Sequence, residues 1–386
     1  MKVVVTGLIA TYPLGGVAWD YLQFVKGFAS LGCEVTYLED TGQWAYDPGR
    51  ATFSEDGDMN ARYLHEVMSR VPGMQRSFAF RDARGTLYGL AEHEVERRCR
   101  TADLLLNVSD SCWLREKYRG ARVTACYDSD PLYTQAAWLA ADGGDRSNGR
   151  EPGWYRVYDV FFSMAENIAD PACAVPRCGL EWKTTRQPIT LADWPVRFDP
   201  SVERFTTVMS WKTKPALPVV NGRVYGGKDV EFRRFLDLPQ RVRTPLEIAV
   251  SGPAPRDEMA AAGWRIVDAS ERSTTMERYR DYIGASRGEW SVAKEAYVAS
   301  DSGWFSCRSA CYLAMGKPVV VQDTGFSRIY PTGEGLFGFR SAEEAVAALA
   351  AIEADYSRHC QAARALAERF FRAETVLEKL LHDAGL

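Results

Sequence analysis

The chain has 386 residues, 46% of them hydrophobic and 25% charged, which is enough to bury the cores of two α/β domains. Its net charge of −4 offers no basic face, so we expect no nucleic-acid partner. No apolar run approaches the roughly 20 residues that span a bilayer, and residues 1–10 lack the longer apolar core of a signal peptide. We therefore expect a cytoplasmic protein without an integral membrane segment.

The cysteines and histidines are not spaced as a metal site. Cys173 and Cys178, or Cys307 and Cys311, stand at spacings near those of zinc ligands, but neither pair has a partner pair at a usual distance. We expect reduced, mostly buried thiols, with no bound metal and no cofactor.

The first half of the chain alternates strands and helices. Residues 2–6 are an apolar, β-branched run, and residues 19–31 carry apolar side chains at helical spacing. The segment 31–38 stops that helix on a glycine and restarts a strand. Further strands are expected at 103–108, 122–127 and 160–163, with helices between them. The proline-rich segment 186–200 is expected to connect this half to the next.

A second alternating series follows. It predicts strands at 205–210, 246–250, 264–267 and 319–321, helices near 229–236 and 276–282, and helical structure from 342 to the end. Two successive series indicate an α/β protein with two Rossmann-like, doubly wound domains that face each other across a cleft. We place the domains at residues 1–200 and 201–365, followed by a C-terminal helical segment at 366–386.

The most informative segment is 302–325, SGWFSCRSACYLAMGKPVVVQDTG. It predicts a loop, a helix, a tight turn, a strand and a second loop. At the helix start, Ser306, Arg308 and Ser309 offer hydroxyls, a guanidinium and unpaired backbone N–H groups to an anion. The loop Asp323, Thr324 and Gly325 follows a strand, at the edge where α/β sheets bind ligands. We expect a phosphorylated ligand here; the alternatives are a plain helix cap and an Asx turn.

Two lysines extend this candidate site. Lys228 follows two glycines just before a predicted helix, and Lys294 ends a further candidate segment that begins at Gly288. The alternatives are a surface turn and a solvated helix residue. Trp211 and Trp304 lie in loops that should face the cleft, where their rings could stack on a sugar, although most rings of this chain belong in the core.

With these residues in view, the chain resembles the GT-B glycosyltransferases. Gly15 and Gly16, followed by a helix and by LGCEV at 31–35, are typical of the N-terminal domain of that family. The segment 312–325, YLAMGKPVVVQDTG, is similar to its helix, strand and donor-sugar loop. The resemblance implies that the second domain holds most of a nucleotide-sugar, that no metal is required, and that the last helix returns to the first domain.

The chain departs from the family at one point. Retaining members commonly carry two glutamates, separated by seven residues, before the Gly-x-Pro turn. Alignment on Gly316 and Pro318 puts Gly303 and Cys311 at these positions, and neither residue can replace a glutamate carboxylate. The departure favours inversion at the anomeric carbon.

The first domain is expected to bind the acceptor and supply a base. Asp128 and Asp130 follow the strand at 122–127, and we favour Asp130 as the base, with Asp128 beside it and Glu166 in reserve. The alternative for Asp130 is a helix cap before Pro131. Asp20 is a further carboxylate near the glycines. The residues expected to contact the acceptor are Gly15, Gly16, Asp20 and Asn167.

These inferences predict a glycosyltransferase that takes a nucleotide-sugar as substrate. The expected partners are that donor, a small-molecule or glycan acceptor and, as an alternative to a monomer, a second copy in a homodimer. Two other functions stay open: a catalytically silent GT-B-like binding subunit and a sugar-nucleotide epimerase. A NAD-dependent enzyme would need Gly-x-Gly-x-x-Gly after the first strand, and the sequence there, TGLIA, does not supply it.

Overall fold

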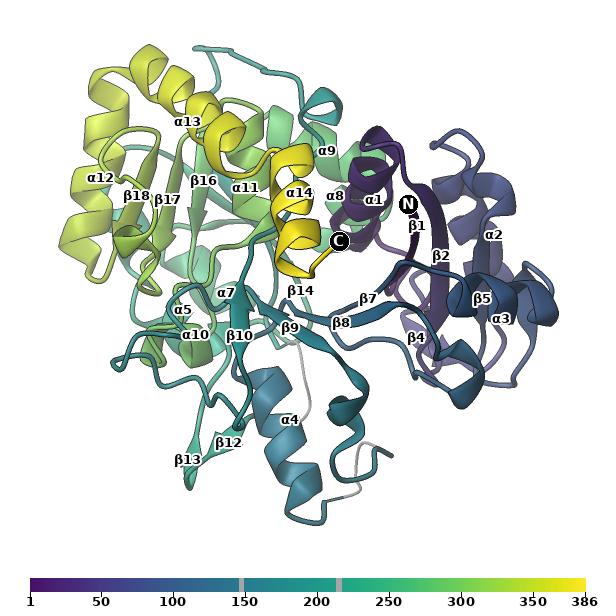
Figure 1. Cartoon of the computed structure of the whole chain (residues 1–386). Helices are drawn as coiled ribbons and strands as arrows, with labels where there is room; N and C mark the ends of the chain where they lie inside the picture. Colours follow the sequence, from purple (N-terminus) through teal and green to yellow (C-terminus); the bar gives the residue numbers. More distant parts are fainter. Residues whose placement is uncertain (146–148, 213–216) are drawn as a thin grey trace.

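The computed structural model describes residues 1–145, 149–212 and 217–386, and two mainly parallel sheets organise them (Figure 1). The first sheet has the strand order β10-β9-β8-β7-β1-β2-β5-β6, and only β6 runs antiparallel to its neighbour. Its strands are β1 (Lys2–Thr6), β2 (Glu34–Asp40), β5 (Phe78–Arg81), β6 (Leu87–Gly89), β7 (Leu104–Val108), β8 (Val123–Asp128), β9 (Val160–Ser163) and β10 (Trp182–Thr184). We call this sheet and its helices, residues 2–184, the first lobe.

The second sheet has six parallel strands in the order β15-β14-β11-β16-β17-β18. They are β11 (Phe205–Ser210), β14 (Leu246–Ser251), β15 (Arg265–Asp268), β16 (Gly288–Ser291), β17 (Val319–Gln322) and β18 (Leu336–Phe339). We call this sheet and its helices, residues 205–339, the second lobe. The strand order reverses between β11 and β16, and such a reversal opens a crevice at the carboxyl ends of the strands.

Helices cover both sheets, and two small antiparallel hairpins project from the lobes. The helices are α1 (Gly15–Ser30), α2 (Asp58–Met68), α3 (Glu92–Arg100), α4 (Tyr133–Asp142), α5 (Lys228–Arg233), α6 (Leu238–Arg241), α7 (Arg256–Ala261), α8 (Ala269–Ser273), α9 (Met276–Gly284), α10 (Glu295–Ala299), α11 (Cys307–Ala314), α12 (Ala342–Ala354), α13 (Tyr356–Phe370) and α14 (Ala373–Asp383). The hairpins pair β3 (Ala45–Asp47) with β4 (Thr52–Ser54), and β12 (Val219–Val220) with β13 (Arg223–Val224).

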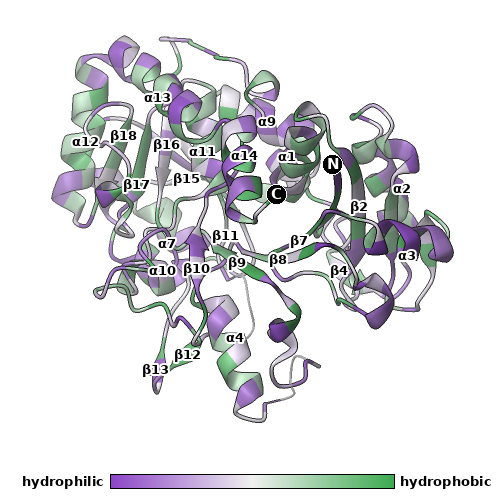
Figure 2. Cartoon of the chain, in the orientation of Figure 1, coloured by the Kyte–Doolittle hydropathy of each residue, from purple (hydrophilic) through white to green (hydrophobic). Residues whose placement is uncertain are grey.

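Short 3-10 turns complete the described elements, at Met74–Arg76, Glu116–Tyr118, Trp154–Val157, Leu191–Asp193 and Phe326–Arg328. The strands β17 and β18 are largely hydrophobic, whereas α3 is largely hydrophilic (Figure 2). This contrast fits strands covered on both faces and a helix that buries only a narrow stripe. Within the described residues, no helix is both long and apolar enough to cross a bilayer.

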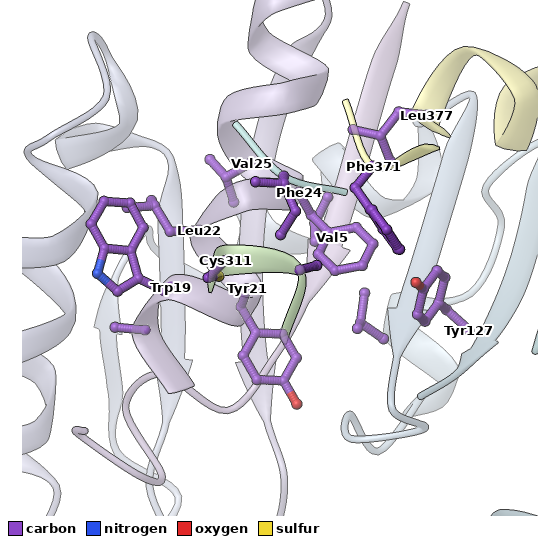
Figure 3. Packing of buried hydrophobic residues seen from close by; sticks show 14 of the residues in the cluster. Val5, Trp19, Tyr21, Leu22, Phe24, Val25, Tyr127, Cys311, Phe371 and Leu377 are labelled. Atoms are coloured by element: carbon purple, nitrogen blue, oxygen red, sulfur yellow. The ribbon is translucent and has the colours of Figure 1, made fainter. Parts of the chain in front are cut away.

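One apolar cluster joins the two lobes around α1 (Figure 3). It contains Phe24 of α1, Tyr127 of β8, Cys311 of α11 and Leu377 of α14, all 1% exposed or less. Phe24 and Tyr127 meet edge to face with ring centroids 5.0 Å apart. Because burial of apolar area is the main favourable contribution to folding, this shared cluster ties the lobes together.

The C-terminal helix α14 packs on α1 of the first lobe. A side chain at Gly27 of α1 would lie 2.5 Å from a Leu377 methyl group, and Ile189 forms a β-bridge with Arg372 just before α14. The expected fold class is therefore confirmed, with two Rossmann-like units and a last helix that returns to the first. The first sheet ends at residue 184 and the second begins at 205, while the domain limits at 200 and 365 stay predictions.

Candidate functional site

A cavity that is partly open to solvent, with about 290 Å³ of empty space, lies at the carboxyl ends of β16 and β17, beside the start of α11. Five of the predicted donor-binding residues line it, namely Lys228, Ser306, Arg308, Ser309 and Thr324. These residues come from α5, α11 and the loop after β17. The topology rule that places ligands outside strand carboxyl ends explains why such distant segments converge here.

Arg308 is the central cation of the cavity, and its position is fixed by the sheet behind it. Its Nε donates to Glu289 Oε1 at 2.5 Å, its Nη1 to the Val208 carbonyl at 2.8 Å and its Nη2 to Ser291 Oγ at 2.7 Å. Burial opposes the charged guanidinium, but the Glu289 carboxylate, together with Tyr279 and Tyr312, raises the pKa of Arg308 above its ordinary value. The side chain therefore stays charged, with its orientation set before any ligand arrives.

Arg308 and Lys294 both lie close enough to Lys228 for their charges to interact with its amine. Burial and, after it, the charges of Arg308 and Lys294 together lower the pKa of Lys228 to about 7, although the Glu289 carboxylate opposes them. Within the described part of the chain, Lys228 forms no hydrogen bond or ion pair. Cations held together in this way stabilise a bound anion, because an anion relieves their mutual repulsion.

The first turn of α11 adds donors to the same cavity. Ser306 is the N-cap residue, and its side chain does not cap the helix. The Ser309 hydroxyl is buried and has no hydrogen-bond partner among the described residues. A buried unpaired hydroxyl costs roughly 1–3 kcal/mol, so its presence beside unpaired helix N–H groups and cations indicates a ligand site.

The loop after β17 is occupied by its own contacts. Asp323 accepts hydrogen bonds from Gly325 N at 2.9 Å and Ser327 Oγ at 2.8 Å, and it pairs with Arg340 at 3.0 Å. The Thr324 hydroxyl donates to the Trp304 carbonyl at 2.6 Å. The Asx-turn alternative thus describes Asp323 well. Neither Asp323 nor Gly325 belongs to the cavity lining, and both lie next to it in the chain.

Asp128 and Asp130 occupy different surroundings. Asp128 is fully buried and accepts hydrogen bonds from Ser163, Thr134 and Gln135 at 2.7 to 2.8 Å. Burial raises its pKa, and these hydrogen bonds oppose the rise. Asp128 therefore holds α4 and β9 together. Asp130 instead accepts from Lys294 Nζ at 2.8 Å and from the Tyr297 hydroxyl, both in the second lobe.

Glu166 and Asn167 also bridge the lobes. Glu166 pairs with Arg186 and accepts a hydrogen bond from the Tyr330 hydroxyl, and burial raises its pKa. Asn167 is 7% exposed, and its amide donates at 3.1 Å to the carbonyls of Asp301 and Gly325. The structure thus brings Asn167 against the donor-side loops, with little of its surface open to an acceptor.

The space around Gly15 and Gly16 is filled by the second lobe, which differs from the acceptor-binding expectation. A Cβ at Gly15 would lie 2.1 Å from the Thr275 carbonyl oxygen, and one at Gly16 would lie 3.1 Å from the Tyr279 ring. Trp19, one turn along, donates its indole N–H to the Met276 carbonyl at 2.9 Å. The two glycines therefore permit α1 to pack closely against α9.

Asp20 is a first-lobe carboxylate close enough to Arg308 for the two charges to interact. Burial raises its pKa to about 7, although a hydrogen bond from the Cys307 thiol and the charge of Arg308 both lower it. Cys307 is the first residue of α11, directly before Arg308 in the chain. Asp20 thus faces the start of α11, half-buried, with a pKa near neutrality.

Several cavity residues were missed by the sequence reasoning. Ser291, Phe305, Gln322 and Phe326 line it, and Glu289 fixes Arg308 from β16. Ser291 and Gln322 could have been found as the last residues of their strands.

Trp304 lines the cavity as expected, whereas Trp211 is 3% exposed and packs in the core against Phe232. In the described ranges, no cluster of three His, Cys, Asp or Glu could hold a metal ion.

Comparison with known proteins supports the architecture. No family model and no curated protein matches the sequence. Among solved structures, an alpha-glucosyltransferase in complex with UDP and a 13-mer DNA is 11% identical, with a TM-score of 0.58 and full coverage of both chains. AviGT4, a glycosyltransferase involved in avilamycin A biosynthesis, is 15% identical with a TM-score of 0.57, covering 100% of this chain and 97% of its own.

Anabaena Alr3699/HepE in complex with UDP and glucose is 10% identical, with a TM-score of 0.57 over 100% of this chain and 99% of its own. At these identities the similarity shows the fold, which is that of these glycosyltransferases. Some of the similar structures contain DNA, so they lend no support to the expectation that nucleic acid is not a partner.

Proposed function

We propose that this chain is a glycosyltransferase that moves a sugar from a nucleoside-diphosphate donor to an acceptor hydroxyl. The observation that carries the proposal is the cavity at the start of α11, where Lys228 and Arg308 meet the unpaired Ser309 hydroxyl. A diphosphate needs charge and hydrogen-bond donors together, and this cavity offers both. The fold shared with structures that hold UDP supports the same ligand class.

The diphosphate leaves as negative charge develops on it, so its partners matter most in the transition state. Arg308 is held by Glu289 and Val208 and does not reorganise during the reaction. Lys228 gains a proton as the anion arrives, because its pKa starts near 7. These groups do the work of a metal ion, and we therefore propose a metal-independent transfer.

The acceptor hydroxyl needs a base in the first lobe, and Asp20 fits this role best. Its carboxylate faces the start of α11, and its pKa of about 7 lets it accept a proton near neutral pH. The other candidates have partners: Asp130 pairs with Lys294, Glu166 with Arg186, and Asp128 is buried among hydrogen-bond donors. We keep them as comparisons in the experiments.

The reaction is a single displacement in which the charges balance. The acceptor oxygen forms a bond to the anomeric carbon as its proton moves to Asp20. The bond from the anomeric carbon to the diphosphate breaks, and its electron pair stays on the phosphate oxygen. Attack opposite to the leaving group inverts the anomeric carbon. Inversion is also favoured because Gly303 and Cys311, the latter buried in the core, stand where retaining enzymes of this fold commonly carry glutamates.

The first experiment measures thermal stabilisation by UDP, GDP, dTDP and CDP, since a ligand that binds the folded state raises the melting temperature. We expect one of them to stabilise the wild type and Lys228→Met to lose that effect, while Lys379→Met, a change at an exposed side chain of α14, keeps it. The absence of stabilisation by all four would overturn the proposal. Binding without transfer to any acceptor in a panel would favour a silent binding subunit, and conversion of the donor alone would favour an epimerase.

A further inference from the structure

One part of the cavity lining is apolar. Trp304, Phe305, Val321 and Phe326 form it. Phe305 and Phe326 meet edge to face with centroids 5.3 Å apart, and the Trp304 ring stacks on Tyr297 at 4.3 Å. These contacts hold the rings in place, so this part of the wall is rigid and presents carbon to the ligand.

Three of the polar side chains near this wall, Gln322, Thr324 and Ser291, are already hydrogen-bonded within the protein. The Gln322 carbonyl oxygen accepts from Ala293 N at 3.2 Å, and its amide nitrogen donates to Glu231. The Thr324 hydroxyl donates to the Trp304 carbonyl. Ser291 accepts from Arg308 and donates to the Val292 carbonyl at 3.2 Å. Little hydrogen-bonding capacity remains here for a ligand.

Carboxylates are missing from the same wall. No Asp or Glu stands in the cavity lining that the described residues form. Asp323, the carboxylate nearest in sequence, is 7% exposed and is used by Ser327, Gly325 and Arg340. A fully hydroxylated hexose needs acceptors for its O–H groups, and carboxylates are the side chains best suited to supply them. The cavity lacks that complement.

We infer that the donor sugar is a deoxyhexose, with a C–H where glucose has a hydroxyl. This inference rests on the proposed function, since it concerns the sugar carried by the diphosphate. A hydroxyl buried against Phe305, Phe326 and Val321 would lose its water without gaining a partner, whereas a methyl or methylene group would gain contact. The sugar ring thus lies on the aromatic wall while the diphosphate meets the cations.

The experiment compares donors that share a nucleotide and differ by one hydroxyl. Calorimetric titration measures the Kd of UDP-glucose against UDP-6-deoxyglucose, and of dTDP-glucose against dTDP-6-deoxyglucose, with UDP and dTDP alone as references. UDP-N-acetylglucosamine tests whether an N-acyl group fills the apolar wall instead. We expect the deoxy donor to bind roughly tenfold tighter than its hydroxylated partner, a value in the range that apolar sites achieve against an added hydroxyl.

Two variants link the preference to the wall. Val321→Thr puts a hydroxyl on it at nearly constant volume and should reduce the preference several-fold. Val219→Thr makes the same change on exposed β12, outside the cavity, and should leave the preference unchanged.

Equal Kd values within both pairs, or tighter binding of UDP-N-acetylglucosamine than of the deoxy donors, would overturn the inference about the sugar. Binding of UDP or dTDP would still support the proposed function in that case. Failure of UDP, GDP, dTDP and CDP alike to bind would overturn both.

Discussion

Lys294 donates a hydrogen bond to Asp130 across the two lobes, with 2.8 Å between Nζ and Oδ1. The Tyr297 hydroxyl donates to the same carboxylate, and the Trp304 indole donates to the Ser129 carbonyl at 3.0 Å. The loop after β8 is therefore clamped to the edge of the cavity. A donor-side lysine and the carboxylate first expected to act as the base are partners of each other.

The Lys294–Asp130 pair should contribute measurably to stability. Both side chains are largely buried, with side-chain exposures of 10% and 22%. Removing one partner takes an ion pair out of a largely buried site, so Asp130→Asn should lower the free energy of unfolding by about 2–3 kcal/mol. The double variant Asp130→Asn/Lys294→Met should recover part of this loss. Urea unfolding of the wild type, Asp130→Asn, Lys294→Met and the double variant measures the coupling free energy. Additive losses would contradict the pairing.

Donor binding should draw a proton onto Lys228. At pH 8 its amine, with a pKa of about 7, is mostly neutral in the free protein, and a bound diphosphate favours the charged form. Titration of UDP at pH 8 in buffers of different ionisation enthalpy should therefore report uptake approaching about one proton. The uptake should vanish at pH 6, where the amine is already charged, and in Lys228→Met. Uptake that persists in Lys228→Met would assign the proton to another group.

Gly15→Ala should disturb the contact between the lobes. Its Cβ would lie 2.1 Å from the Thr275 carbonyl oxygen, so α1 must shift away from α9. Overpacking of this kind costs typically 1–3 kcal/mol, which would lower the melting temperature by several degrees. Gly49→Ala is the matched control, because the nearest atom to its Cβ is a side-chain oxygen of Asp47 at 3.3 Å. Equal melting temperatures for both variants would show that the contact between α1 and α9 can accommodate the added methyl group.

The sequence predicted the strands that are long and apolar. Residues 2–6, 205–210 and 319–321 were recognised because a parallel strand covered on both faces reads as a continuous apolar run. The strands Phe78–Arg81, Trp182–Thr184 and Leu336–Phe339 were missed, since three or four residues with a charge or a glycine give no such signal.

The convergence of Lys228, Ser306 and Arg308 was predictable for a related reason. Each residue lies at or next to the start of a helix, α5 or α11, at the same edge of one sheet. The partners of Asp130, Gly15 and Asn167 were not predictable. Each contacts a residue more than 100 positions away in the other lobe, and that geometry depends on how the lobes dock.

Arg308→Lys should impair turnover although it keeps the charge. A lysine ammonium cannot reach Glu289, Val208 and Ser291 together, so both the fixed orientation and the planar fork are lost. We expect kcat to fall about 100-fold, the size seen when one charge-stabilising donor is removed, with a smaller change in the KM for the donor.

The matched control is Arg287→Lys. Arg287 is equally buried and pairs with Glu353 through two contacts of 2.7 and 2.9 Å, outside the cavity. Arg287→Lys should lower the free energy of unfolding without lowering kcat. The same kcat loss in both variants would show that Arg308 acts only through folding.

Asp20 should set the acid side of the pH–rate profile. A base works in its deprotonated form, and burial raises the pKa of Asp20 from 3.8 to about 7, so kcat should rise with pH through about 7 and then level off. Asp20→Asn should lower kcat by roughly 100-fold or more, in the range attributed to a positioned general base. Asp130→Asn and Glu166→Gln should retain the pH-dependent rise.

A second variant separates a base from a structural carboxylate. The Cys307 thiol donates a hydrogen bond that lowers the pKa of Asp20, so Cys307→Ala removes that effect and raises the pKa. The rising limb of kcat should therefore move to higher pH in Cys307→Ala, while the plateau at high pH is largely kept. A merely structural Asp20 would change stability and leave the position of the limb alone. An unchanged limb in Cys307→Ala, or near-full turnover in Asp20→Asn, would transfer the role of base to another group.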